Sequence, residues 1–251
     1  MKKVTIILFL IAFSGCDSEK AVDCFQSAGK LMTKEIVLPN FEEILILDRV
    51  KLYLTYGETQ KVLVKTGANL LGEIKLSVEE NSLILKNENT CNMVREYKSV
   101  EIYVTSPNLT SVRNGSQWIV ESTNTLVYPN LTLLTEDFNG EGKSHTNGGF
   151  DLQLDCDTLK IVNNGYAVYF LSGKAKQLSV GFYAGDGRLE ASELIVQELE
   201  VFHRSSNQMI VNPQASLRGE IRSTGDVISL NRPPVVEVEE FYTGKLVFET
   251  P

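Results

Sequence analysis

The sequence predicts an all-β protein built as a β-solenoid (a β-helix) that is preceded by antiparallel hairpin strands. The composition is that of an ordinary globular protein, with 43% hydrophobic and 22% charged residues. Short runs of Val, Ile and Leu alternate with polar residues, and this period of two is typical of strands with one buried face. After Pro107 a pattern of leucines and turns recurs, which indicates stacked repeats. A β-sandwich is the alternative, because it also contains short strands at regular spacing.

Residues 1–15 have the pattern of a lipoprotein signal peptide. Two lysines precede an apolar run over residues 4–13, and two small residues lead to Cys16. The run is too short to cross a hydrocarbon core of about 30 Å, so it is expected to be a signal sequence rather than an anchor. Residues 13–16 resemble the bacterial lipobox, in which the cysteine thiol receives a diacylglyceryl group. The alternative is an ordinary signal peptide that leaves Cys16 as a disulfide partner.

Residues 16–34 are expected to be a polar tether between this lipid anchor and the folded domain, because they are mixed in charge and lack a sustained apolar period. Acidic residues behind the lipidated cysteine resemble surface-export signals of Bacteroidota lipoproteins. The predicted location is therefore the bacterial outer membrane, with the lipid-anchored protein either surface-exposed or facing the periplasm. Loss of two lysines with the signal peptide changes the formal net charge from -8 to -10. That charge argues against nucleic acid as a partner.

The remaining cysteines and the two histidines give no metal-site pattern. Cys24 and Cys91 lie in polar segments and form a candidate disulfide, whereas Cys156 ends an alternating run and is expected to point into the core. No two cysteines have zinc-ligand spacing, and His145 and His203 are far apart in the sequence. No metal and no cofactor are expected.

Residues 35–105 are predicted to form antiparallel strands. Apolar residues alternate with polar ones over residues 50–55, 61–65, 74–85 and 100–104. The polar break at residues 79–82 predicts a hairpin.

Residues 106–251 are predicted to form the solenoid, continuous with the preceding strands as one domain. One turn of the solenoid, here called a coil, cannot bury its apolar face alone, so neighbouring coils are expected to stack. The pattern places Leu178 beside Leu199 and Leu189 beside Ile210. Leucines that begin the repeats have spacings of 22, 28, 19, 21 and 18 residues, at Leu109, Leu131, Leu159, Leu178, Leu199 and Leu217.

From about Phe41 to Val236 the chain resembles the head GIN domain family, whose proteins are frequent among Bacteroidota lipoproteins. The resemblance rests on the alternation at residues 50–54, the hairpin at 74–85, the run at 100–109 and the later glycine turns at 185–187 and 224–226. It implies a single-stranded, right-handed β-helix. It implies no established biochemical activity.

No catalytic constellation is assembled in the sequence, so the chain is not expected to be an enzyme. Residues 140–144 resemble the end of a phosphate-binding loop but lack its first glycine and its helix. Asp155 and Asp157 lie on one face of a strand, and carboxylate pairs can perform acid–base chemistry on polysaccharides. An envelope polysaccharide hydrolase or lyase is therefore the alternative to a solvated surface pair that lacks a basic partner.

Aromatic residues recur at similar places in successive repeats. Tyr166, Tyr169 and Tyr183 are the candidate ligand contacts, since adjacent residues of a strand face opposite ways and one of each aromatic pair can lie on the outer sheet. Packing at the coil corners is the alternative. The predicted function is a non-catalytic, adhesin-like or ligand-binding scaffold of the cell envelope, with a glycan or a protein as ligand.

Overall fold

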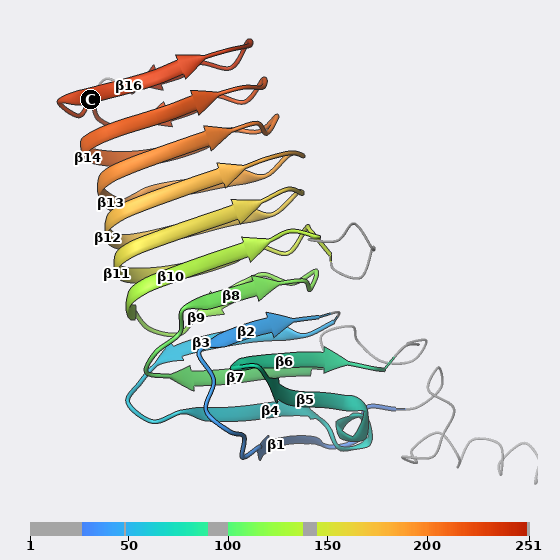
Figure 1. Ribbon diagram of the computed structural model, residues 1–251. Helices are drawn as coiled ribbons and strands as arrows, with labels where there is room; N and C mark the ends of the chain where they lie inside the picture. The colour runs from blue at the N-terminus through green and yellow to red at the C-terminus, as the bar shows by residue number, and fades with distance from the viewer. Residues whose placement is uncertain (1–26, 48, 90–99, 138–144, 250–251) are drawn as a thin grey trace, which may run out of the picture.

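The computed structural model describes residues 27–47, 49–89, 100–137 and 145–249 (Figure 1). Cys16, Cys24, Cys91, the predicted signal peptide and residues 140–144 lie outside these ranges. The all-β prediction is confirmed: the described strands form one curled, mixed sheet, accompanied by one 3-10 helix. The elements are β1 (Leu31–Glu35), β2 (Glu43–Ile46), β3 (Lys51–Tyr56), β4 (Lys61–Gly67), η2 (Ala68–Glu73), β5 (Ile74–Glu79), β6 (Ser82–Asn87), β7 (Val100–Ser106), β8 (Ser111–Asn114), β9 (Val120–Ser122), β10 (Leu126–Thr135), β11 (Phe150–Asn163), β12 (Val168–Phe182), β13 (Arg188–His203), β14 (Met209–Ile221), β15 (Val227–Ser229), β16 (Val235–Glu240) and β17 (Leu246–Phe248).

The N-terminal strands are not uniformly antiparallel, which corrects the prediction for residues 35–105. β1, β4 and β7 pair antiparallel, as do β5 and β6, but β2 pairs in parallel with β6 and β3 pairs in parallel with β7. A period of two identifies the buried face of a strand and carries no information on the direction of its neighbour. The predicted hairpin is present, and its two turn residues, Glu80 and Asn81, both have positive φ. β1 begins at Leu31, so regular structure starts inside the expected tether.

From β10 onward, strands of neighbouring repeats pair in parallel and form a ladder (Figure 1). Each long strand bends partway, so the one curled sheet has two halves around a common core. We name the half that faces the viewer in Figure 1 the front sheet and the half behind it the rear sheet. The front sheet contains residues 158–163, 177–182, 198–203, 216–221 and β16, and the rear sheet contains residues 150–156, 168–175, 188–196, 209–213, β15 and β17. The inward residues of both sheets belong to the same hydrophobic cluster.

The register of the ladder confirms one predicted contact and corrects another. Leu178 pairs with Leu199, and both side chains are 2% exposed. Leu189 pairs with Met209, whereas Ile210 is half-buried and pairs with Glu190. The reason is a difference in spacing: Phe182 and His203 are paired, but Leu189 lies seven positions after Phe182 whereas Met209 lies only six positions after His203. A slip of one residue exchanges the inward and outward faces of a strand.

One glycine in the ladder is required by close backbone packing. Gly219 lies inside β14 with a φ of 130°, a conformation that residues with side chains rarely adopt. A Cβ at this position would lie 1.8 Å from the carbonyl oxygen of Val201 in the neighbouring strand. The glycine therefore permits the spacing between β13 and β14.

Cys156 is a buried free thiol, in agreement with the predicted inward orientation. Burial raises its pKa to about 11, so the thiol is protonated at neutral pH and is a poor nucleophile. Its role is that of a small apolar side chain in the core.

His203 is an ionisable group inside the apolar core. Its side chain is buried, and neither ring nitrogen makes a well-aligned hydrogen bond to a described residue. Burial lowers its pKa from 6.5 to about 4, although the nearby Asn207 backbone and Asp226 favour the protonated form. In the neighbouring strand β12, the residue that pairs with His203 is Phe182. This level of the core therefore accommodates an uncharged aromatic ring.

We therefore predict a pH-dependent loss of stability that the His203→Phe variant lacks. In the unfolded chain the imidazole protonates near pH 6.5, but in the folded protein it protonates only near pH 4. The stability that depends on neutral His203 is fully present above pH 6.5 and is lost as the pH falls towards 4, by roughly 3 kcal/mol in total. Urea unfolding of both proteins between pH 7 and pH 4 isolates the effect, because the carboxylates are common to both. Equal pH dependence in the two proteins would contradict the assignment.

Candidate functional site

The structure separates the three candidate tyrosines. Tyr183 and Tyr166 are 47% and 66% exposed, in agreement with a surface role. Tyr169 is wholly buried, which corrects its assignment as a ligand contact. Its ring packs between Phe150 and Phe182, with centroid distances of 5.6 and 5.5 Å.

The orientation of Tyr169 follows from strand alternation. Its hydroxyl donates to Thr135 Oγ1 at 2.9 Å, which satisfies the one polar atom of the buried side chain. Burial raises the pKa of this hydroxyl, so it remains protonated. The neighbouring Phe170 points outward and is 44% exposed. Each aromatic pair thus has one inner and one outer member, as the sequence predicts.

Tyr183 begins a row of outward-facing side chains, exposed or half-buried, at the C-terminal ends of the front strands. Its ring folds back over Gly181, where a Cβ would lie 2.5 Å from the ring. The same ring stacks on Phe202 with the centroids 5.1 Å apart. Gly181 of β12 is the residue that pairs with Phe202 of β13. Because Gly181 has no side chain, the Tyr183 ring can lie over it and beside the Phe202 ring.

Arg222 continues this row towards the C-terminal end of the ladder. Its guanidinium lies 5.9 Å from the centroid of Phe202 and 4.0 Å from that of Phe241. Glu220 accepts a hydrogen bond from Arg222 Nε and raises the pKa of the guanidinium, which therefore stays charged. We name Tyr183, Phe202, Arg222 and Phe241 the aromatic–arginine stripe. It crosses four successive strands of the front sheet.

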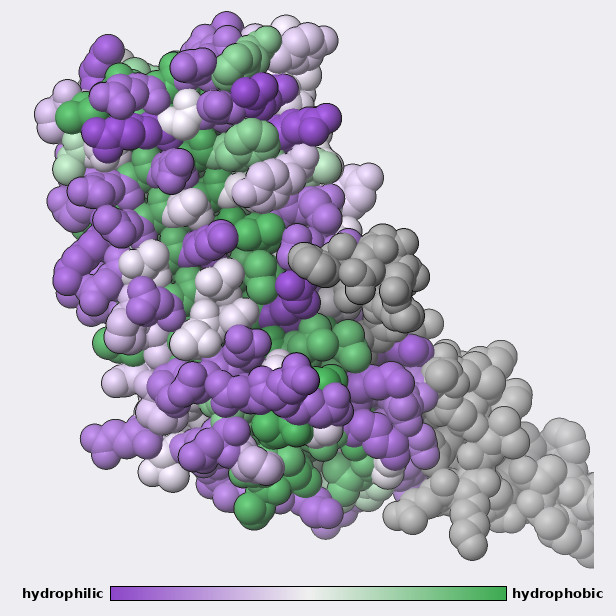
Figure 2. All heavy atoms as spheres, in the orientation of Figure 1, coloured by the Kyte–Doolittle hydropathy of each residue, from purple (hydrophilic) through white to green (hydrophobic). Residues whose placement is uncertain are grey.

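The stripe contains two residues that sequence reasoning did not identify. Arg222 and Phe241 follow Ile221 and Glu240, which pair in the ladder. The sequence signal for them is therefore the register of the repeat, which aligns residues 183, 204, 222 and 241. On the face shown in Figure 2, hydrophilic residues predominate and hydrophobic residues emerge between them along the ladder.

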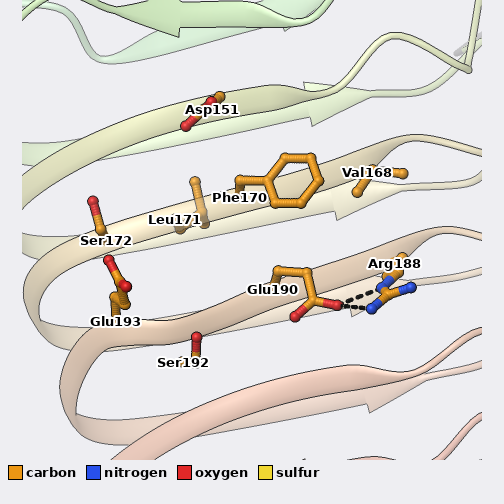
Figure 3. A pocket seen from close by; sticks show the side chains of 9 residues that line it. All are labelled: Asp151, Val168, Phe170, Leu171, Ser172, Arg188, Glu190, Ser192 and Glu193. Atoms are coloured by element: carbon orange, nitrogen blue, oxygen red, sulfur yellow. Dashed lines mark hydrogen bonds and ion pairs between the residues drawn. The ribbon is translucent and has the colours of Figure 1, made fainter.

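A second candidate surface lies on the rear sheet. Residues of β11, β12 and β13 line a shallow groove with a volume of about 640 Å³ (Figure 3). A smaller groove of about 240 Å³ adjoins it and shares Asp151 and Ser172. We name the larger depression the rear groove, lined by Asp151, Val168, Phe170, Leu171, Ser172, Arg188, Glu190, Ser192 and Glu193.

The predicted carboxylate pair lies outside both grooves. Asp155 and Asp157 each form an ion pair, at 3.1 Å with Lys174 and at 2.6 Å with Lys176. The expectation that they lack basic partners is therefore wrong, because the next strand of the ladder supplies both lysines. These are solvent-exposed pairs, which contribute little to stability.

The described ranges contain neither a cluster of metal-ligating side chains nor a membrane-spanning helix. Within them, no three His, Cys, Asp or Glu side chains are grouped as a metal site would require. Over the same ranges, the structure has no helix with the length and apolar character needed to cross a membrane.

Several solved structures share this fold. A putative adhesin from Bacteroides fragilis superposes with a TM-score of 0.75 at 22% identity, covering 88% of this chain and 97% of that one. A putative lipid binding protein from Parabacteroides distasonis gives 0.61 at 15% identity, with coverages of 88% and 98%. A putative adhesin from the same species gives 0.62 at 16% identity, with coverages of 87% and 98%. At these identities the likeness concerns the fold alone.

No curated protein matches the sequence. The family model described as putative auto-transporter adhesin, head GIN domain, matches residues 40–233. That range begins just before β2 and ends just before β16, so it takes in the hairpin strands and most of the ladder. The chain is therefore a member of the head GIN domain family.

Proposed function

We propose that this protein is a non-catalytic, adhesin-like scaffold of the cell envelope, which binds a protein partner through the aromatic–arginine stripe. The observation that carries the proposal is the continuous row of Tyr183, Phe202, Arg222 and Phe241 across four strands. Tyrosine and arginine are enriched among the side chains that dominate binding energy at protein interfaces. Because these side chains already stack on one another, binding would cost little additional conformational entropy.

The proposed location is the bacterial outer membrane, with a lipid anchor at Cys16 and the tether holding the domain on the outer or the periplasmic side. The lipobox-like segment supports the anchor. Membership of a family described in terms of adhesins supports an envelope location. A diacylglyceryl group together with an N-acyl chain would hold the protein far more firmly than one acyl chain, since each buried methylene contributes about 0.8 kcal/mol.

We also infer that the ladder is a single-stranded solenoid with right-handed winding. Consecutive strands from β10 to β14 pair in parallel in sequence order, as a single winding chain requires. Connections between parallel strands of one sheet are right-handed in nearly all known cases. In this arrangement the outer faces of successive coils form continuous surfaces on which a stripe can extend.

The experiment that tests the stripe is capture of envelope proteins by the chain from Asp17 onward. We expect the wild-type chain to retain a discrete partner, and we expect the double variant Tyr183→Ser/Phe241→Ser to lose at least about tenfold in affinity, or 1.4 kcal/mol. The control is Tyr166→Ser, which removes a more exposed tyrosine that lies outside the stripe. Equal capture by the double variant would contradict the proposed surface.

A further inference from the structure

We propose that the rear groove binds a neutral oligosaccharide. The inference rests on the proposed function as a binding scaffold, to which it adds a second site and a ligand class. It is carried by an outward aromatic ring, two hydroxyls and two uncompensated carboxylates, which the backbone places in one depression (Figure 3).

The groove arises from an irregularity in β13. Phe170 pairs with Glu190 and Ser172 pairs with Glu193, so one residue of β12 faces two residues of β13. On the other side of β13, pairing with β14 stops at Glu190 and resumes at Ile195. Bulges of this kind re-aim side chains and are frequent next to functional sites. The depression is therefore built into the backbone, as in a pre-formed ligand site.

The groove has an apolar platform suited to a sugar ring. The Phe170 side chain is 44% exposed, and Val168 and Leu171 lie beside it in the lining. One face of a pyranose ring carries several C–H groups, which pack on the face of an aromatic ring. Phe170 presents such a ring within the groove, between Asp151 and Glu190 (Figure 3).

The polar residues of the lining indicate a neutral ligand. Arg188 is bound by Glu190, so this cation and this carboxylate neutralise each other. Asp151 and Glu193 have no ion-pair partner in the described part of the chain, and they remain available to accept hydrogen bonds from sugar hydroxyls. The same two carboxylates would repel sulfate, phosphate or uronate groups. Ser172 and Ser192 add hydroxyl donors and acceptors.

The combined depressions are long enough for an extended chain. The smaller groove adds Glu121, Asn124 and Gln153 to the lining. Together the two grooves span β9, β11, β12 and β13, which are consecutive neighbours in the sheet. Three strand spacings of about 4.8 Å give a length of roughly 14 Å. That length suits several linked sugar units better than a single small molecule.

The test uses the chain from Asp17 onward and a panel of hexasaccharide probes. The neutral probes are derived from glucan, xylan and mannan, and the anionic probes are a uronate oligomer and a sulfated glucan of equal length. We expect at least one neutral probe to bind in calorimetry and both anionic probes to bind at least about tenfold more weakly. Absence of binding by every neutral probe at millimolar concentration, or equal binding of an anionic probe, would overturn the inference.

Matched variants assign the binding to the groove. Phe170→Ala and Asp151→Asn/Glu193→Gln are each expected to weaken binding at least about tenfold. The control for the first is Ile195→Ala, a 49% exposed side chain of the rear sheet outside the groove, and the control for the second is Asp155→Asn. All four variants alter outward-facing residues, and circular dichroism would check their folding. Unchanged binding by both groove variants would overturn the site.

The outcomes also distinguish this inference from the proposed function. Cleavage of a bound probe would contradict the non-catalytic proposal and favour the polysaccharide-enzyme alternative, while leaving the groove as a sugar site. Loss of probe binding in Phe170→Ala with unchanged capture of the envelope partner would support two separate surfaces. Capture that depends on the stripe, without any neutral-sugar binding, would overturn only the groove.

Discussion

Replacing Leu199 with aspartate is expected to unfold the ladder. Leu199 is 2% exposed and lies between Leu178 and Leu217 in the paired strands, where all three side chains are buried. A carboxylate at this position would lose its hydration in an apolar stack. The cost of an unpaired buried charge exceeds the marginal stability of most domains.

A smaller change at the same position gives a measurable free energy. Leu199→Ala is expected to lower the free energy of unfolding by about 2–5 kcal/mol, through lost burial and the cavity that remains. The control is Gln197→Ala, an exposed residue of the same strand, for which we expect a change within about 0.5 kcal/mol. Urea denaturation followed by circular dichroism measures both. An effect of Leu199→Ala no larger than that of the control would contradict the stacked core.

Replacing Cys16 with serine is expected to abolish lipidation. Acyl transfer forms a thioether through the cysteine sulfur, and a serine hydroxyl cannot form that bond. The variant should therefore be absent from the membrane fraction, because without acyl chains the acidic chain has no means of anchoring in the bilayer.

Metabolic labelling with a fatty-acid analogue and fractionation of cells would measure this effect. Cys156→Ser provides the control, since it removes a cysteine from the described core rather than from the proposed lipidation site. Labelling of the Cys16 variant at the wild-type level would exclude the lipid anchor.

The period of two predicted strands in both halves of the chain and many of the residues that they bury, although Tyr169 and Ile210 were placed on the wrong face. The pairing of Leu178 with Leu199 follows from their equivalent positions at the start of successive repeats, which the ladder brings together. The pairing of Leu189 with Met209 could not be obtained in this way, since the spacing from His203 to Met209 is one residue shorter than the spacing from Phe182 to Leu189. The prediction of antiparallel strands for residues 35–105 was wrong in part, because alternation identifies the buried face of a strand and not the direction of its neighbour.

The candidate surfaces were only partly predictable. Tyr183 was identified from its type and position. Tyr169 was misassigned because alternation shows that the two members of an aromatic pair face opposite ways, but does not by itself show which member faces inward. Arg222 joins the stripe only through the alignment of successive strands. The rear groove depends on the bulge in β13, which is visible only once the register between neighbouring strands is known.

The most direct test of the central claim, that the protein acts by binding through the stripe, is site-specific photocrosslinking in intact cells. Benzoylphenylalanine would replace Tyr183 or Phe241 in the stripe, or Val127, which is 41% exposed and lies outside it. We predict a discrete adduct with one envelope protein from both stripe positions and none from position 127. The absence of adducts from the stripe, or equal adducts from position 127, would contradict the claim.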